Sequence, residues 1–215
     1  MGAERAVIWR HGQTAYNKAR RIQGQSDIPL DETGLAQAAT AAEQLVELEP
    51  GAIVSSDLVR AAATAGALAA LTGLEVSLDT RLRERNFGDW EGESAANLHE
   101  RWPAEFALWR QGHDIESIGM ERRSKAAARV AAAVEAAADA AADGSTLVVA
   151  THGGASVCGI TALLGLDPET WFGLRVMRNA HWAVLERGRV LGPPWRLVGY
   201  DLGELEGAPG MNPWT

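Results

Sequence analysis

The chain has 215 residues, 47% of them hydrophobic and 22% charged, and this composition excludes a disordered, collagen-like or disulfide-stapled protein. Its 28 acidic residues outnumber the 20 basic ones, which leaves a formal charge of −8 and argues against a general nucleic-acid-binding protein. The single cysteine, Cys158, cannot form an internal disulfide, and we find neither a signal sequence nor an apolar run of the roughly 18 residues that span a bilayer, so we expect a cytoplasmic protein with no membrane partner.

Short apolar runs alternate with longer helical stretches up to Leu78, which is the pattern of an α/β domain. Thr33 is the predicted N-cap of the first helix, and Gly73 is the residue predicted to end the second. The predicted elements of this part are strands over residues 5–10, 52–55 and 74–78, and helices over residues 33–48 and 57–72.

Between Arg81 and Glu121 the pattern changes, because tryptophans, glycines and charged residues are mixed. We expect a small helical cap here, inserted at about residues 86–120 and lying over the functional site. The remaining predicted elements are helices over residues 94–101, 103–111, 121–142 and 155–165, a strand over 146–150, and a hairpin over 183–185 and 190–191.

Together these elements predict one domain over residues 1–215, a three-layer α/β/α sandwich with a mostly parallel central sheet and the inserted cap. The helix over residues 121–142 is rich in alanine. Its small side chains could pack closely against a second copy of the chain, which would make a homodimer.

Two predicted strands end in a histidine followed by glycine, at His11-Gly12 and His152-Gly153. Ligands of open α/β sheets bind outside this carboxyl edge, and a glycine there lets the backbone N–H approach an anion. Either histidine alone could be a structural residue bonded to a nearby carbonyl. A metal site is a weaker alternative, because no two histidines are three to five residues apart and no cysteine supports them, so we expect no metal and no other cofactor.

Arginines at the same edge indicate an anionic ligand. Arg10 precedes His11, and Arg60 follows the strand over residues 52–55. Planar guanidinium groups match the paired oxygens of a phosphate, so both could face one crevice. The alternative for Arg60 is a solvated position on a helix surface.

Several ordered motifs between residue 5 and about residue 165 closely resemble the signature of the histidine phosphatase superfamily, in its phosphoglycerate-mutase-like branch. They are Arg10-His11-Gly12-Gln13-Thr14, Asn17, Arg21-Ile22-Gln23-Gly24, Asp31-Glu32-Thr33-Gly34, Ser55-Ser56-Asp57-Leu58-Val59-Arg60-Ala61, Leu82-Arg83-Glu84, Gly88-Asp89-Trp90-Glu91-Gly92 and Thr151-His152-Gly153-Gly154.

The resemblance implies that His11 is a nucleophile that forms a phosphohistidine, and that Arg10, Arg60 and His152 bind phosphate oxygens and stabilise the transition state. It implies further that a phosphate pocket is completed by Asn17, Gln23, Gly24 and Gly153.

Glu84 matches the general acid of the family, which protonates the leaving oxygen and later activates water. Without the resemblance, a surface ion pair with Arg83 or Arg85 would be the better interpretation of this glutamate.

The resemblance also indicates which reaction of the family to expect. Mutases of the family carry a longer insertion between the positions of Glu84 and His152, so the short cap here favours a phosphatase that acts on a small phosphorylated metabolite, with glucosyl-3-phosphoglycerate as the substrate that the motifs suggest. A phosphoglycerate mutase and a non-catalytic phosphometabolite-binding protein are the alternatives.

Many relatives carry Gly-Gly-Glu-Ser before the long helix, whereas this chain has Gly119-Met120-Glu121-Arg122. Arg122 could contact a second acidic group of the substrate, although a solvated arginine is the more common case.

Overall fold

The computed structural model describes residues 2–188 and 192–203. Within them, one sheet has the strand order β3-β2-β4-β1-β5-β6. Strands β3, β2, β4 and β1 are parallel, and β5 and β6 are added antiparallel. The strands are β1 (Arg5–Arg10), β2 (Pro50–Ser55), β3 (Val76–Leu78), β4 (Thr146–Thr151), β5 (Trp182–Arg187) and β6 (Trp195–Leu202).

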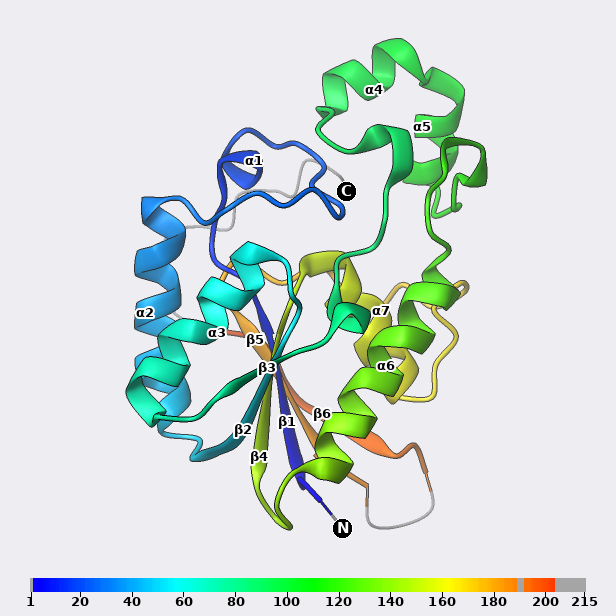
Figure 1. Cartoon of the computed structure of the whole chain (residues 1–215). Helices are drawn as coiled ribbons and strands as arrows, with labels where there is room; N and C mark the ends of the chain where they lie inside the picture. The colour runs from blue at the N-terminus through cyan, green and yellow to red at the C-terminus, as the bar shows by residue number, and fades with distance from the viewer. Residues whose placement is uncertain (1, 189–191, 204–215) are drawn as a thin grey trace.

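Helices cover both faces of this sheet, with α2 and α3 on one side and α6 and α7 on the other (Figure 1). Successive residues of β1 point to opposite faces, so Val7 and Trp9 pack in the core beneath α2 and α3, whereas Ala6 and Ile8 pack beneath α6 and α7. This arrangement confirms the predicted three-layer α/β/α sandwich. The helices are α1 (Ala15–Lys18), α2 (Glu32–Val46), α3 (Val59–Thr72), α4 (Ala95–Arg101), α5 (Pro103–Arg110), α6 (Arg123–Ala140) and α7 (Gly153–Leu163).

The two predicted helix boundaries had different outcomes. Gly73 adopts a left-handed conformation with φ 72° and ends α3, as predicted. The prediction of Thr33 as N-cap of α2 was wrong, because Asp31 caps this helix and its carboxylate accepts the Gly34 N–H at 2.8 Å. Aspartate and threonine both serve as N-caps, and the sequence pattern did not distinguish between two candidates that lie two residues apart.

The described residues contain a C-terminal hairpin, whose second strand begins at Trp195. In it, β5 pairs antiparallel with β6. Pro193 and Pro194 come immediately before it and cannot donate ladder hydrogen bonds, so the strand starts after them. The predicted strand residues 190–191 lie outside the described part of the chain.

Helices α4 and α5 form a lobe beyond the carboxyl ends of the parallel strands (Figure 1). The lobe has a small core of its own, in which Trp90 contacts the rings of Trp102, Phe106 and Trp109. Three 3-10 turns, Thr80–Leu82, Gly88–Trp90 and Glu116–Ile118, lie on the two connections to the sandwich. Within the described residues, no helix combines the length and the apolar character that crossing a membrane requires.

Candidate active site

A cavity of about 950 Å3 lies at the carboxyl edge of the sheet. Its walls come from the end of β1, the starts of α3 and α7, the chain before α2, the cap, the segment before β5 and the end of β6. The sequence-predicted site residues on its walls are Arg10, His11, Asn17, Gln23, Gly24, Arg60, Glu84 and Gly153. His152 lies behind this wall, with its ring centroid 5.2 Å from that of His11.

The imidazole of His11 is oriented by a hydrogen bond to the backbone of the next residue. Its Nδ1 lies 2.7 Å from the carbonyl oxygen of Gly12, an acceptor that only a protonated Nδ1 can satisfy. In the neutral ring the lone pair is therefore on Nε2. The side-chain amide of Asn179 donates to the carbonyls of His11 and Gly12 at 3.1 and 3.2 Å, which fixes the turn itself.

Arg60 extends from the start of α3 into the space between the two histidines, and it is fully buried. Its Nε–H is shared by His11 Nε2 at 3.3 Å and His152 Nδ1 at 3.1 Å. Its terminal nitrogens donate to the carbonyls of Gly24 at 2.8 Å and Ser26 at 2.7 Å. The alternative of a solvated surface arginine is excluded by this burial.

His152 follows β4 at the N-cap position of α7, and both of its ring nitrogens have partners. Nδ1 accepts from Arg60, so the neutral ring carries its proton on Nε2, which lies 2.8 Å from the hydroxyl oxygen of Ser56. Ser56 was part of a motif in the sequence, but only the fold shows that it orients this imidazole.

Both histidines are held in the neutral form. Burial, followed by the charges of Arg60 and Arg10, places the pKa of His11 well below its ordinary value of 6.5. Burial and the charge of Arg60 are also the two largest causes that lower the pKa of His152. Neutral imidazoles are consequently available over the whole physiological pH range.

Arg10 forms part of the same wall. One terminal nitrogen donates to the Met177 carbonyl, while its buried Nε has no hydrogen-bond partner among the described residues. A buried N–H without an acceptor is costly, and an anion in the cavity would supply one. Gly153 leaves this space open, because a Cβ there would lie 2.6 Å from Val176 Cγ1 and 3.3 Å from Arg10 Nε.

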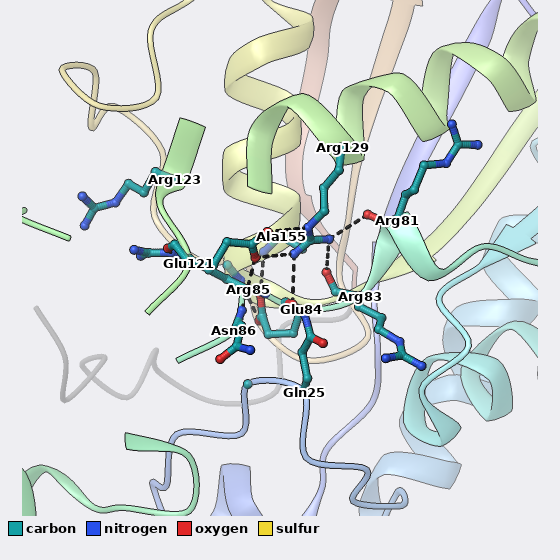
Figure 2. Close-up of polar contacts among 12 residues, drawn as sticks. Gln25, Arg81, Arg83, Glu84, Arg85, Asn86, Glu121, Arg123, Arg129 and Ala155 are labelled. Carbon is teal, nitrogen blue, oxygen red and sulfur yellow. Dashed lines mark hydrogen bonds and ion pairs between the residues drawn. The ribbon is translucent and has the colours of Figure 1, made fainter. Parts of the chain in front are cut away.

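Glu84 is fixed against the N-terminus of α7. Its carboxylate accepts the backbone N–H groups of Arg85 at 2.7 Å, Gly154 at 2.9 Å and Ala155 at 2.7 Å (Figure 2). The alternative of a surface ion pair is excluded, because Arg83 pairs with Asp57 and Arg85 pairs with Asp114.

The chain between β1 and α2 supplies the opposite wall. Gly24 has φ 53° and presents its carbonyl to Arg60. The Oε1 atom of Gln23 is buried without a described partner, and the Oδ1 atom of Asn17 accepts from Asn179 at 3.2 Å.

The structure places Arg122 away from the cavity. Its exposed side chain pairs with exposed Glu116 at 2.5 Å, so it does not face the site.

The arginines that do line the outer part of the cavity are Arg20, Arg21, Arg175 and Arg178. Of these, Arg178 pairs with Asp201, whereas Arg20 and Arg175 form no ion pair with any residue that the structure describes. Arg175 stands in a segment without a motif, so nothing local in the sequence indicated it.

The chain is similar to known proteins along most of its length. The family model of the histidine phosphatase superfamily (branch 1) matches residues 6–192. The chain is 42% identical over 192 residues to glucosyl-3-phosphoglycerate phosphatase from Mycobacterium tuberculosis, with 86% of each chain covered. It is 36% identical over 200 residues to a probable phosphoglycerate mutase from Yersinia pestis, with 89% of this chain and 87% of the relative covered. The solved structure of a mycobacterial glucosyl-3-phosphoglycerate phosphatase complexed with VO3 matches with a TM-score of 0.84 and 39% identity, covering 92% of this chain and 98% of that one.

Proposed function

The chain belongs to the histidine phosphatase superfamily and is a phosphatase, and from this premise we propose that it hydrolyses a phosphomonoester through a phosphohistidine on His11. The observation that carries the proposal is the setting of His11. Its Nδ1–H is bound to the Gly12 carbonyl, and its Nε2 lies beside Arg60 in a wall of the cavity. A fixed imidazole with its lone pair next to a cation suits attack on a phosphoryl group.

In the first step, Nε2 of His11 forms a bond to phosphorus while the bond from phosphorus to the ester oxygen breaks. Arg60 donates to this nitrogen, and Arg10 and Arg60 on the cavity wall would stabilise the negative charge of the transferring group. His152, which accepts from Arg60 behind the wall, would orient this guanidinium. Glu84 would donate a proton to the departing oxygen. In the second step, Glu84 takes a proton from water, which attacks phosphorus and releases inorganic phosphate from His11.

For the substrate, we propose glucosyl-3-phosphoglycerate. The volume of about 950 Å3 exceeds what a phosphate alone occupies. Beyond the phosphate-binding end, Arg20 and Arg175 could receive the glycerate carboxylate, and Phe87 and Trp109 offer aromatic surface to the sugar. Mycobacterial relatives named for this activity support the choice.

The test is release of inorganic phosphate from a metabolite panel, measured in chelator beside the His11→Ala variant. The panel contains glucosyl-3-phosphoglycerate, 3-phosphoglycerate, sugar phosphates and nucleoside monophosphates. Chelator-resistant release from glucosyl-3-phosphoglycerate, lost in His11→Ala, supports the proposal and its metal independence. If chelator abolishes turnover and added divalent metal restores it, the proposed metal independence is wrong. Interconversion of phosphoglycerates without phosphate release would indicate the mutase, and no turnover at all would indicate a binding protein.

We also propose a cytoplasmic location and a homodimer. A buried thiol at Cys158, with no second cysteine in the chain, suits a reducing compartment. Ala128, Ala132 and Ala136 are exposed on α6 at a spacing of four residues, so a second copy could pack closely against these small side chains. Cell fractionation tests the first point, and mass measured by light scattering tests the second.

A further inference from the structure

Arg129 lies on α6, and it is not among the residues that line the cavity. Its guanidinium nevertheless holds the segment that carries Glu84 (Figure 2). One terminal nitrogen donates to the carbonyls of Arg81 at 2.7 Å and Arg83 at 2.6 Å, and the other donates to the carbonyl of Glu84 at 3.0 Å. We propose that Arg129 is a positioning residue for Glu84, through its hold on the backbone of residues 81–84.

Glu121 orients Arg129. Its two carboxylate oxygens accept from Nε and from a terminal nitrogen of Arg129, at 2.9 and 2.8 Å, and the two side chains are only 8% and 18% exposed. Burial opposes the charge of Glu121, but the hydrogen bonds and charge of Arg129 outweigh it and lower the pKa of this carboxyl. Because the planar fork is held on one side by a bidentate partner, its remaining N–H groups have fixed directions.

The segment that Arg129 holds has little regular structure of its own. Between the 3-10 turns Thr80–Leu82 and Gly88–Trp90 the chain crosses from the sandwich to the cap. Carbonyls outside helices and strands need other donors. The guanidinium of Arg129 donates to three of these carbonyls, and the Gln25 side chain is a second donor to the Glu84 carbonyl at 3.1 Å.

Glu84 is thus held at both ends, its carboxylate by the amides of Gly154 and Ala155 and its backbone carbonyl by Arg129 and Gln25. Proton transfer to a leaving oxygen requires the donor within hydrogen-bond reach, and a displacement of about 1 Å can cost on the order of 100-fold in rate. Loss of Arg129 should therefore impair the step that needs the proton more than the steps that do not. This inference rests on the proposed role of Glu84 as the acid.

The experiment compares kcat/KM for two substrates in the full-length protein. p-Nitrophenyl phosphate has a leaving group that departs without a proton, whereas glycerol phosphate needs one. We expect Arg129→Ala to reduce kcat/KM for glycerol phosphate by about 30- to 100-fold and for p-nitrophenyl phosphate by less than about threefold. Glu84→Gln should show the same selectivity more strongly. Arg129→Lys, which keeps one charge but loses the fork, should fall between the wild type and Arg129→Ala.

Arg122→Ala is the matched control, because this arginine also pairs with a glutamate but is exposed and holds no part of residues 81–84. It should leave both rates unchanged. An equal loss on both substrates in Arg129→Ala, or in Arg129→Lys if the alanine variant does not fold, would overturn the inference. If Glu84→Gln is selective and both Arg129 variants are not, only the inference is wrong. If Glu84→Gln itself reduces both rates equally, the acid assignment fails, and the inference fails with it.

Discussion

The Nε–H of Arg60 donates to Nε2 of His11 across 3.3 Å, although the two residues are 49 positions apart in the chain. They reach each other because β1 and β2, which flank β4, end at the same edge of the sheet. The contact places a permanent positive charge beside the nitrogen that would attack phosphorus. Because both side chains are buried, the same contact that serves the chemistry also contributes to the stability of the fold.

Replacement of Arg60 by lysine should reduce kcat/KM for phosphomonoesters by about 100- to 1000-fold, because an ammonium is a point charge and cannot replace the guanidinium fork at the developing phosphoryl charge. It also cannot reach His152, Gly24 and Ser26 together, as Arg60 does. Steady-state kinetics of phosphate release measures the loss. Arg83→Lys is the control, since Arg83 forms a partly exposed pair with Asp57, and it should cost less than about threefold. Equal rates in Arg60→Lys and wild type would contradict the proposed site.

The free energy of unfolding should fall as pH decreases below about 6.5. His11 and His152 have pKa values lowered in the folded protein, so below the ordinary value of 6.5 the unfolded chain binds protons that the folded protein does not. Stability then rises with pH across this interval and is fully present above it. Urea unfolding at about pH 7.5 and about pH 5.5 measures the difference.

His11→Asn should make this dependence on pH smaller, because one of the two neutral imidazoles is then absent. His99→Gln is the control, since His99 is exposed on α4. An unchanged difference between the two pH values in His11→Asn would mean that His11 is not the source of the effect.

Gly24→Ala should lower both stability and activity. Gly24 has φ 53°, and a Cβ there would lie 2.0 Å from the Oε1 of Glu91. We expect a loss of about 1–3 kcal/mol in the free energy of unfolding, and a lower kcat/KM because the Gly24 carbonyl also holds Arg60. Gly73→Ala is matched to it, with φ 72° but nothing within 4 Å of the added Cβ. This variant should lower the free energy of unfolding through backbone strain only, and kcat/KM should stay unchanged. A fall in kcat/KM of the same size in both variants would disprove the specific role of Gly24.

Arg175→Ala should raise KM by about tenfold for 3-phosphoglycerate and leave KM for glycerol phosphate within about twofold, because a hydrogen bond to a charged group contributes about 1.5–3 kcal/mol. The two substrates differ by the carboxylate that Arg175, on the wall of the cavity, would bind. Arg122→Ala should change neither KM value, since Arg122 pairs with Glu116 outside the cavity. If Arg122→Ala produces the selective effect and Arg175→Ala does not, the carboxylate is bound elsewhere than we propose.

Much of the fold could be predicted from the sequence because its signals are local. The runs that became β1, β2 and β4 are short and apolar, and each is followed by residues that stop a strand. Helix α3 ends at Gly73 because glycine readily adopts the left-handed conformation found there. The wrong N-cap of α2 is an error of boundary, where neighbouring residues had similar preferences.

The sequence by itself determined the chemistry that the edge of the sheet offers, because His11, Arg60 and His152 follow predicted strands at that edge. The role of Glu84 came from the resemblance to the family. Only the tertiary structure decided which side chains act together. Arg129 reaches residues 81–84 from α6, Asn179 reaches the turn at His11 from the far end of the chain, and Arg122 faces away from the cavity. Such contacts join residues distant in sequence, and no local preference encodes them. They follow from how the helices and the sheet bury their apolar faces, which brings the polar ends of separate segments together.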